Sequence, residues 1–383
     1  MKKVLIFGSS GSIGRSTLEI IRKNKRNFKI LGLSVNKNID VLYRQIREFS
    51  PSYVCVVDEK AAKRLKKKLV GKVKVLYGID GLREFSSLSA DISVMGIVGI
   101  SSLMPFIVSL RHSKRVALAS KEVLVVAGDI VKKELKKSKA ELIPVDSEIN
   151  ALFQLLGCIK RKHLKKIYIT ASGGALLDYS SSLKRVTPSV VLAHPNWRMG
   201  ERITVDSATL VNKGFEVMES HYLFDLDYKM IDVVVHRQSY IHAFIETKDN
   251  MLFSCWYKPN MVIPLAFSLY YPERNLPGNG LEVSFSKLNL SFEKVNYHKF
   301  PLFKIVLEAA QKGGNFPIVV NAADEVAVRF FLEEKIRFYD IYRAVEYIFS
   351  KTRKDKVSNL KGVYFWDRWA RAKTEEFLNN LCG

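Results

Sequence analysis

Apolar and polar positions alternate regularly over the first 150 residues of the chain. Short runs rich in Val, Ile and Leu have the length of buried strands. The segments between them place apolar residues three or four positions apart, as amphipathic helices do. Strands that alternate with helices predict an α/β domain with a parallel sheet covered on both faces. We expect strands at 3–8, 28–35, 53–58, 73–78, 91–99, 115–120 and 141–146.

The pattern changes near residue 150, where strands and helices no longer alternate strictly. This central part has the mixed pattern of an α+β domain. We expect a helix at 149–159, a strand and a glycine-rich turn at 165–174, a polar loop at 193–209, a helix at 210–224, and an antiparallel hairpin formed by 233–247 and 251–259 around the turn KDN.

The last part of the chain predicts a small helical bundle. Pro272, Pro277, Gly278 and Gly280 mark a linker before it. Amphipathic helices are expected at 302–314, 321–335, 338–351 and 367–381. The expected domains are therefore a nucleotide-binding domain at 1–148, a catalytic α+β domain at 149–271, a linker at 272–300 and a C-terminal helical domain at 301–383.

The charge of the chain is unusual, although its composition is that of a folded protein. Hydrophobic residues make up 48% of the 383 residues and charged residues 26%, but the formal net charge is +23. The basic runs at 63–74, 132–139 and 160–166 are typical of solvated helix faces and loops. An anionic small substrate, a membrane surface and nucleic acid are alternatives. Nucleic acid is disfavoured, because aromatic residues do not interleave with these runs as stacking on bases requires.

The cysteines and the N-terminus predict a cytoplasmic protein. Cys55, Cys158, Cys255 and Cys382 are widely spaced and form no CxxC pair, which argues against a disulfide framework or a zinc site. The apolar run before Gly8 is too short for a signal peptide, and no run approaches the about 18 apolar residues of a membrane span.

The motif Gly8-Ser9-Ser10-Gly11-Ser12-Ile13-Gly14 joins the first expected strand to the first expected helix. Glycines let the backbone turn tightly and approach a pyrophosphate, whose charge the free N–H groups of a helix start bind. The spacing is GxxGxxG rather than the commoner GxGxxG, so a purely structural turn is an alternative. Between a strand and a helix, the motif predicts a Rossmann-like dinucleotide site.

The end of the second expected strand favours NADPH over NADH. Enzymes that use NADH usually carry an acidic residue there, which accepts from the ribose 2′-hydroxyl. This chain instead has Asn36, Lys37 and Asn38, with Asp40 further on. A cation and two amides suit a 2′-phosphate, while an ordinary polar loop is the alternative interpretation.

Three carboxylates form a candidate site for a hard metal ion. Asp146 and Glu148 end the seventh expected strand, and residues i and i+2 of an extended chain point to the same side. Glu216 shares a helix face with Asn212 and Lys213. Oxygen ligands favour Mg²⁺ or Mn²⁺ over zinc. Each carboxylate could also be an ordinary surface charge, and spacing alone does not show that the three meet.

An ordered series of motifs resembles the 1-deoxy-D-xylulose 5-phosphate reductoisomerase family over most of the chain. The run from HPNWRMG through VNKGFE is long and specific. The motifs are GSSGSIG (8–14), VNKN (35–38), ALASKE (117–122), PVDSE (144–148), TASGGAL (170–176), HPNWRMG (194–200), TVDSATLVNKGFEV (204–217) and NAADEVAV (321–328).

The resemblance implies a role for each matching residue. It implies that Asp146, Glu148 and Glu216 bind Mg²⁺ or Mn²⁺ and that they act in catalysis together with Lys121 and His194. The implied substrate-binding residues are Lys121, Ser147, Glu148, Ser172, His194, Trp197, Ser207, Asn212, Lys213 and Glu216. The implied NADPH-binding residues are Gly8, Ser10, Gly11, Ser12, Ile13, Asn36, Lys37, Asn38, Ser120, Glu122 and Gly200.

Two of these roles have plain alternatives. His194 could be a core or capping histidine, although its HPNW setting favours the substrate. Trp197 lies on a polar loop next to Pro195, where it is awkward as a core residue, so we expect it with Met199 on a lid.

The chain departs from the family pattern at five positions, none of which removes an expected ligand. Ser10 stands where Thr is usual, Ile149 where His is usual, and Arg237 where Pro is usual. Asp324 replaces the usual Asn of NAANE. Ser120 replaces another usual Asn, which puts one cofactor contact in doubt.

The reaction that the resemblance implies has two stages. The ketose phosphate rearranges to a branched aldehyde with the metal as Lewis acid, and NADPH reduces this aldehyde to 2-C-methyl-D-erythritol 4-phosphate. A homodimer is a further expectation. The rivals are an NADPH-dependent dehydrogenase of another phosphorylated substrate and a basic nucleic-acid-binding protein on a Rossmann-like scaffold.

Overall fold

The chain folds into two compact units. The computed structural model describes residues 1–383 except 70, 72, 180–185, 276–280, 286–287 and 383. Unit 1 comprises Met1–Val123, Val131–Asn150 and Asn260–Leu281, and unit 2 comprises Leu124–Ile130, Ala151–Pro259 and Glu282–Gly383. The expected class is confirmed, because an N-terminal parallel sheet is followed by a mixed region and C-terminal helices.

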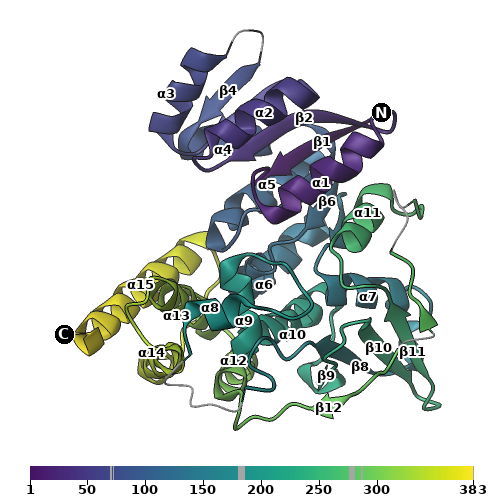
Figure 1. The fold of residues 1–383 in the computed structure, drawn as a ribbon, viewed down its shortest axis with the longest axis vertical. Coiled ribbons are helices and arrows are strands. Elements are labelled where there is room, and N and C mark those ends of the chain that lie inside the picture. Colours follow the sequence, from purple (N-terminus) through teal and green to yellow (C-terminus); the bar gives the residue numbers. More distant parts are fainter. Residues whose placement is uncertain (70, 72, 180–185, 276–280, 286–287, 383) are drawn as a thin grey trace. The chain divides into compact units, whose positions relative to one another are not determined.

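Unit 1 is built on a seven-stranded parallel sheet with the order β4-β3-β2-β1-β5-β6-β7 (Figure 1). All seven strands that the apolar runs predicted are present. Their side chains are mostly buried, as expected for a sheet covered on both faces. The strands are β1 (Lys2–Phe7), β2 (Phe28–Val35), β3 (Tyr53–Val56), β4 (Lys74–Tyr77), β5 (Ala90–Met95), β6 (Ser113–Leu118) and β7 (Glu141–Pro144).

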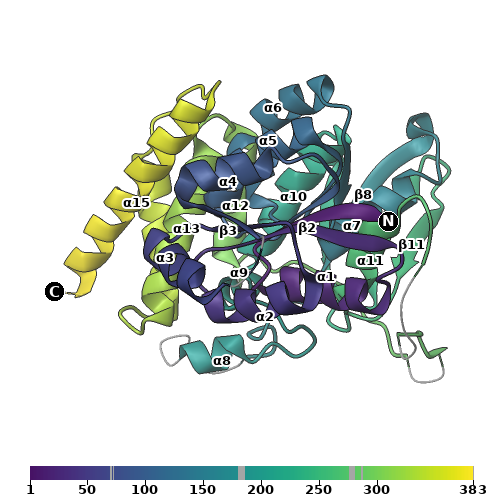
Figure 2. The same cartoon turned by 90° about the horizontal axis from the view of Figure 1, so that it is seen from above.

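Helices cover both faces of this sheet (Figure 2). One face carries α1 (Ser12–Lys23), α2 (Ile39–Phe49) and α3 (Glu59–Lys68), and the other carries α4 (Gly78–Ser86) and α5 (Leu103–His112). A short 3-10 helix, η1, at Ile100–Ser102 leads into α5. The crossover helices therefore lie where βαβ units place them.

A helix from much later in the chain completes the core of unit 1. The segment VIPLAFSLY forms α11 (Val262–Tyr270), which the sequence analysis did not predict. Its Leu265 and Leu269 are fully buried in the same cluster as Val4 and Ile6 of β1. Figure 1 shows α11 beside α1. A helix that is apolar on most sides has to be buried, and unit 1 supplies the surface that buries it.

Unit 2 contains a five-stranded mixed sheet with the order β11-β10-β8-β9-β12. The expected hairpin is confirmed as the antiparallel pair β10 (Ile241–Thr247) and β11 (Leu252–Trp256). The segment 233–247 is not one strand as expected, because it divides into β9 (Ile231–Val235) and β10. A turn with Ser239 at φ 56° separates them, and β9 instead runs parallel to β8 (Leu164–Ala171).

The helices of unit 2 include the expected C-terminal group (Figure 1). Gly214 of α10 lies so close to α12 that an added Cβ would come within 2.4 Å of Val306 Cγ1, so only glycine permits this helix packing. The helices and remaining short elements are η2 (Arg161–His163), α8 (Pro188–Leu192), α9 (Glu201–Thr209), α10 (Val211–Phe224), η4 (Tyr228–Met230), β12 (Glu293–Lys294), α12 (Pro301–Lys312), α13 (Phe316–Leu332), α14 (Phe338–Lys351) and α15 (Leu360–Cys382).

Two helices bridge the division of the chain into units. In α6 (Glu122–Lys137), residues Leu124–Ile130 group with unit 2 and both ends of the helix group with unit 1. Helix α7 (Ser147–Leu156) passes from unit 1 to unit 2 after Asn150. Inside α6, Ala127 has non-helical angles, φ −144° and ψ 26°. The next residue, Gly128, lies against the ring of Tyr222, where a Cβ would come within 2.3 Å of a ring carbon.

The expectation of a polar loop at 193–209 is wrong for its second half, which forms α9. Thr, Ile and Val are weak helix formers, so the local sequence gives little helical signal. Burial stabilises the helix instead, since residues 204–209 are all buried. The hydroxyl of Thr204 donates to the carbonyl of Gly200, and that of Thr209 donates to the carbonyl of Asp206. Polar side chains are thus satisfied inside a buried helix.

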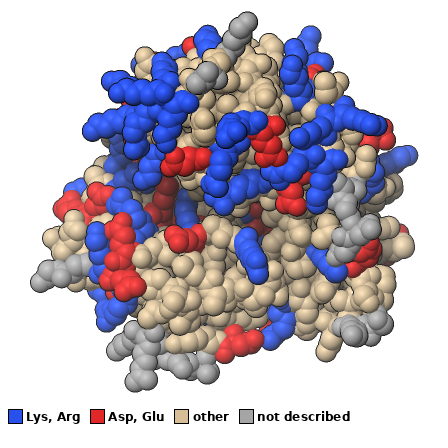
Figure 3. All heavy atoms as spheres, turned by 45° about the horizontal axis from the view of Figure 1, so that its top comes forward, with Lys and Arg blue, Asp and Glu red and all other residues tan. Residues whose placement is uncertain are grey.

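Lys and Arg side chains gather over the upper part of the face shown in Figure 3, whereas other residues cover most of its lower part. In α3, Ala61, Ala62 and Leu65 are buried, while six cations face solvent: Lys60, Lys63, Arg64, Lys66, Lys67 and Lys68. This is the pattern of an amphipathic surface helix. Among the described residues, no helix combines the length and apolarity needed to cross a membrane. Pro277, Gly278 and Gly280 of the expected linker lie outside the described residues.

Candidate active site

The glycine-rich turn of unit 1 depends on two positions where no side chain fits. Gly8 has φ +77°, and an added Cβ would come within 2.6 Å of the Gly96 carbonyl oxygen. A Cβ on Gly14 would come within 2.4 Å of Ser9 Cα. One side of the turn therefore packs tightly, through Gly8 against Gly96 and through Gly14 against Ser9. Gly11 and Ser12 are exposed on the other side, at the start of α1.

A buried amide holds this turn in place. The Ser9 hydroxyl donates to Gln45 Oε1 at 2.7 Å, and Gln45 Nε2 donates to the Ser9 carbonyl at 2.9 Å. Both residues are buried. Ser9 is thus engaged with α2, while the N–H groups of the first turn of α1 have no intrahelical partners. The arrangement leaves a helix start available to an anion. Gln45 could not be recognised from the sequence, because a single polar residue on a helix gives no signal.

Asn36, Lys37 and Asn38 follow β2 and are all exposed. Asn38 also caps α2, because its Oδ1 accepts from Val41 N at 3.2 Å. Its amide nitrogen can still donate. The segment therefore presents one cation and amide donors to solvent at the carboxyl end of a parallel strand, where nucleotides bind in sheets of this kind.

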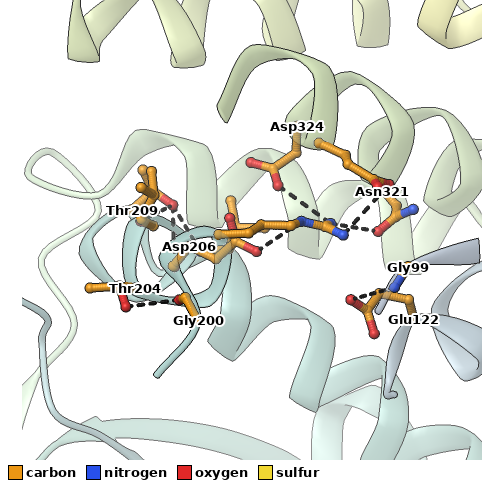
Figure 4. A network of polar contacts seen from close by, with 12 residues as sticks. Gly99, Glu122, Gly200, Thr204, Asp206, Thr209, Asn321 and Asp324 are labelled. Carbon is orange, nitrogen blue, oxygen red and sulfur yellow. Dashed lines mark hydrogen bonds and ion pairs between the residues drawn. The ribbon is translucent and has the colours of Figure 1, made fainter. Parts of the chain in front are cut away.

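The side chains of Ser120 and Glu122 both form hydrogen bonds around the end of β5 in unit 1. The Ser120 hydroxyl contacts the carbonyl oxygens of Ile97 and, at 3.2 Å, Met95, so it bonds to the loop after β5. Glu122 Oε1 accepts from Gly99 N at 3.3 Å (Figure 4). Both side chains are buried. These bonds hold the ends of neighbouring strands together.

Asp146 and Glu148 do not lie on an extended strand, so that expectation is wrong. β7 ends at Pro144 and α7 begins at Ser147, which leaves Asp146 in the turn before the helix and Glu148 in its first turn. The Asp146 carbonyl accepts from Asn150 N at 2.7 Å, as a residue at a helix start does. Ligand oxygens of the two carboxylates still lie within 4.8 Å of each other.

Lys121 provides the charge beside Asp146. Its buried ammonium forms a short ion pair with Asp146 Oδ2. Asp146 Oδ1 is also buried and has no hydrogen-bond partner within the described part of the chain. Leaving such an oxygen without a donor is costly, so it is well placed to bind a cation. Glu148 accepts from the hydroxyl of Ser147.

In unit 2, the corner between α9 and α10 gathers the other expected carboxylate and its neighbours. Glu216 is buried, Asn212 Nδ2 donates to its Oε1 at 2.7 Å, and the Lys213 ammonium pairs with its Oε2. The predicted helix face is thus confirmed. Leu210, at φ 61°, makes the sharp turn between the two helices.

The glycine-rich turn after β8 packs directly on α9. Gly173 and Gly174 have φ +86° and +68°, and a Cβ on Gly174 would come within 2.7 Å of the Ser207 carbonyl oxygen. Gly174 N also donates to the hydroxyl oxygen of Ser172 at 3.3 Å. The backbone geometry therefore places Ser172 close to the end of α9 that carries Ser207.

The protonation state of His194 follows from its neighbours. Its Nδ1 faces the backbone N–H groups of Asn196 and Trp197 at 3.1 and 3.0 Å, so this nitrogen must accept. Nε2 then carries the proton and donates to the Ser172 hydroxyl oxygen at 3.0 Å. Burial lowers the pKa of the ring below its usual value, which favours this neutral form. The Ser172 hydroxyl proton remains available to an acceptor such as a phosphate.

Trp197 is partly buried and contacts His242, with ring centroids 6.0 Å apart. The adjacent Asn196 anchors this segment, since its Nδ2 donates to the Arg237 carbonyl and lies 3.3 Å from Ser239 Oγ. The Arg237 side chain pairs with Asp178 at 3.0 Å and with Glu293 at 2.7 Å. The segment is thus tethered at its base, and Met199 and Gly200 follow before α9 begins.

Histidine-selective NMR tests the arrangement around His194. With ¹⁵N-labelled histidine, we expect the Nε2–H tautomer at neutral pH and a pKa below the usual value of about 6.5. The lowered pKa means that this residue contributes stability at neutral pH that is lost as pH falls below about 6.5. A His194→Gln variant assigns the signal. An Nδ1–H tautomer would show that the two backbone donors do not engage the ring.

Family models match three parts of the chain. Residues 4–128 match 1-deoxy-D-xylulose 5-phosphate reductoisomerase, residues 142–224 match its C-terminal domain, and residues 257–373 match a model described as DXP reductoisomerase C-terminal domain. Each match lies where the sequence motifs of the resemblance lie or beside them.

Curated relatives agree over nearly the whole chain. The 1-deoxy-D-xylulose 5-phosphate reductoisomerase of Thermodesulfovibrio yellowstonii is 43% identical over 374 residues, which cover 97% of this chain and 98% of that protein. The enzyme of the same name from Thermoanaerobacter pseudethanolicus is 43% identical over 349 residues, which cover 90% of this chain and 91% of that protein.

Solved structures give the same result. A crystal structure described as DOX-P reductoisomerase in complex with NADPH, fosmidomycin and magnesium aligns with a TM-score of 0.93 and 33% identity, over 100% of this chain and 99% of the other. The reductoisomerase of Zymomonas mobilis in complex with NADPH aligns with a TM-score of 0.89 and 33% identity, over 98% and 99% of the two chains. The resemblance seen in the motifs is confirmed, and the chain belongs to the 1-deoxy-D-xylulose 5-phosphate reductoisomerase family.

Proposed function

We propose that this chain is an NADPH-dependent and metal-dependent enzyme that converts 1-deoxy-D-xylulose 5-phosphate to 2-C-methyl-D-erythritol 4-phosphate, a step of isoprenoid precursor synthesis by the methylerythritol phosphate pathway. Family membership names the reaction. The single observation in this chain that carries the proposal is the buried Asp146 Oδ1, which accepts no hydrogen bond from the described residues and lies close to a second carboxylate, Glu148. A bound cation would stabilise two neighbouring carboxylates of which one has a buried oxygen without a hydrogen bond.

We assign Asp146, Glu148 and Glu216 as ligands of one Mg²⁺ or Mn²⁺ ion. Carboxylate oxygens suit hard divalent cations, and related structures are described as magnesium complexes. When bound, the ion supplies a Lewis acid for the hydroxyl and carbonyl oxygens of the substrate. Lys121 and Lys213 each hold one of these carboxylates by an ion pair, which fixes its orientation.

The substrate phosphate has a set of suitable donors in unit 2. We assign Ser172, Ser207, Asn212 and Lys213 to it, with His194 beside them. Ser172 has a hydroxyl proton to donate because His194 and Gly174 both donate to its oxygen. Phosphate contacts far from the reacting carbons position the substrate and supply binding energy. Trp197 and Met199 would cover the bound substrate and exclude water from the reactive aldehyde.

We assign the remaining substrate and cofactor contacts from the motifs. Ser147 adjoins Glu148 and would hold the substrate with it. NADPH, which supplies hydride when bound, would lie on the glycine-rich turn of unit 1, with its 2′-phosphate at Lys37. The assigned NADPH contacts are Gly8, Ser10, Gly11, Ser12, Ile13, Asn36, Lys37, Asn38, Ser120, Glu122 and Gly200.

The hydrogen bonds of Ser120 and Glu122 bear on this assignment. Their side chains already contact Ile97 and Gly99. We therefore expect these two residues to shape the cofactor pocket through the loop after β5 as well as by direct contact.

Nucleotide binding is assigned to residues 1–148, catalysis to 149–271, linkage to 272–300 and a supporting helical domain to 301–383.

We further propose a cytoplasmic homodimer. Cys55 and Cys158 are free thiols, which suits a reducing compartment. Among the described residues, the edge strand β11 pairs only with β10, and it exposes 61% of Leu252 and 39% of Phe253. An exposed apolar edge strand invites pairing with a second copy of the chain.

Loss of NADPH absorbance with 1-deoxy-D-xylulose 5-phosphate tests the activity and the metal together. We expect oxidation only with Mg²⁺ or Mn²⁺. Glu148→Gln and Glu216→Gln should each lower metal-dependent turnover by at least about 100-fold, since even residues behind a ligand cost about 10- to 100-fold. Glu201→Gln, an exposed carboxylate at the start of α9, is the matched control and should change little.

Two results would contradict this assignment. Absence of NADPH oxidation with metal present would reject the reaction itself. Undiminished turnover of Glu148→Gln, together with unchanged Mn²⁺ binding measured by calorimetry, would instead remove Glu148 from the ligand set while leaving the reaction in place.

Charge reversal at Lys37 tests the 2′-phosphate contact. Lys37→Glu should lower kcat/KM with NADPH by about 10- to 100-fold, because a hydrogen bond to a charged group is worth about 1.5–3 kcal/mol. The kcat/KM with NADH, which lacks the 2′-phosphate, should change far less. Lys60→Glu, an equal charge change on exposed α3, controls for the net charge. A clear preference of the unaltered protein for NADH would refute the assignment.

A lysine on the edge strand tests the dimer. Leu252→Lys should shift the mass measured by light scattering from that of two chains to that of one, because a charged edge resists strand pairing. Ile79→Lys, which replaces another exposed apolar side chain in unit 1, should leave the mass unchanged. An unaltered protein with the mass of one chain would reject the proposal.

A further inference from the structure

A buried charged cluster in unit 2 lies outside the residues assigned above. Arg202 of α9 reaches Asp206 one turn further along its own helix, with 3.5 Å between Nε and Oδ2. It also reaches α13, where its Nη2 donates to Asn321 Oδ1 at 3.1 Å and lies 3.8 Å from Asp324 Oδ2. Figure 4 shows Asp324 and Asn321 on one helix facing Asp206 on the other.

The cluster contains more acidic than basic groups. Glu325 lies 3.5 Å from Arg202 Nη1 and 2.6 Å from Arg371 of α15. The charged groups that act on Asp324 thus include Asp206 and Arg202 from α9 and Glu325 from its own helix, while Arg371 reaches the cluster through Glu325. Two carboxylates that face each other in a dry interior cannot both remain ionised without an equal number of cations.

Asp324 is the group that can keep a proton. Its side chain is fully buried, and within the described part of the chain neither of its oxygens accepts a hydrogen bond. Burial, and next the repulsion of Asp206, raise the pKa of Asp324 well above its ordinary value. In the acid form, Asp324 can donate its proton to the Asp206 carboxylate, which satisfies both groups.

We infer that Asp324 is a positioning residue, which holds α9 against α13 through a proton shared with Asp206 and through Arg202, and thereby positions Ser207 for the substrate. Asp206 immediately precedes Ser207, so a shift of Asp206 moves the assigned phosphate contact. The same helix leads through Leu210 into α10, which carries Asn212, Lys213 and Glu216.

The consequence is a specific response to alkaline pH. When Asp324 ionises, it repels Asp206 and loosens the contact between α9 and α13, so the KM for the sugar phosphate rises while bound substrate still turns over. Asp324→Asn keeps a donor for Asp206 and cannot ionise. Its KM should equal that of the unaltered protein near pH 7 and should stay flat as pH rises.

Asp324→Leu removes the donor and keeps a side chain of similar size. We expect its KM to rise about ten-fold or more at neutral pH, with a smaller change in kcat, because displacement of a binding group costs affinity and orientation. Asp367→Asn is the matched control. It alters another buried acid, one that pairs with Arg371 at 2.8 Å on α15. It should leave the pH profile of KM unchanged even if stability falls.

The inference on catalysis rests on the proposed function, but its protonation step is tested without turnover. Unfolded Asp ionises near pH 3.9, whereas Asp324 keeps its proton when folded, so its contribution to stability falls as pH rises above about 4. The Tm gain of Asp324→Asn over the unaltered protein should therefore be larger at about pH 8 than at about pH 5. This comparison holds even if the protein has another substrate.

Each outcome of these measurements supports or overturns the role inferred for Asp324. A Tm difference independent of pH would show that Asp324 does not keep a proton and would overturn the inference. A pH-dependent Tm difference together with superimposable KM profiles for Asp324→Asn and the unaltered protein would overturn the positioning role. A flattened KM profile in Asp324→Asn, absent from Asp367→Asn, would support it.

Discussion

The candidate site depends on backbone segments that approach each other more closely than a Cβ atom allows. Gly8 and Gly14 hold the glycine-rich turn of unit 1 against Gly96, which follows β5, and against Ser9, and Gly174 holds the turn after β8 against α9. Gly214 does the same between α10 and α12. Because added atoms at these positions would meet backbone or the branched part of Val306, the approach cannot be relieved by turning a flexible side chain. The positions of the functional hydroxyls and carboxylates follow from these contacts.

Buried charge is the second organising feature. In each unit, a carboxylate assigned to the metal is paired with a lysine, Asp146 with Lys121 and Glu216 with Lys213. Removing one partner of such a pair leaves an uncompensated charge and costs about 3–5 kcal/mol. The pairs therefore supply each buried carboxylate with an opposite charge and fix its orientation.

The sequence predicted most of the fold, and it failed where burial overrides local preference. The seven apolar strands of the first sheet were found because a strand buried on both faces is apolar throughout. Helix α9 was missed because its Thr, Ile and Val residues favour other structure and are held helical only by burial. The position of Glu148 was wrong because strand β7 ends two residues before Asp146, and such boundaries carry little signal.

The candidate site was predictable to the extent that its residues fall in recognisable motifs. Asp324 stands where the family usually has Asn, and it contacts Arg202 and Asp206. These residues lie more than 100 positions away in the printed sequence, and no local pattern links them to Asp324. The contact of Gln45 with the glycine-rich turn of unit 1 was not predicted, because a single polar residue on a helix gives no signal in the sequence.

The late helix α11 has a consequence for how the protein is made. Leu265 and Leu269 fill the core of a sheet whose last strand ends at Pro144. A ribosome therefore releases the whole sheet more than a hundred residues before the helix that covers part of it. During that interval the nascent sheet exposes an apolar face, so the early chain is open to chaperone capture and to aggregation. A fragment that ends at residue 150 would keep that exposed face permanently.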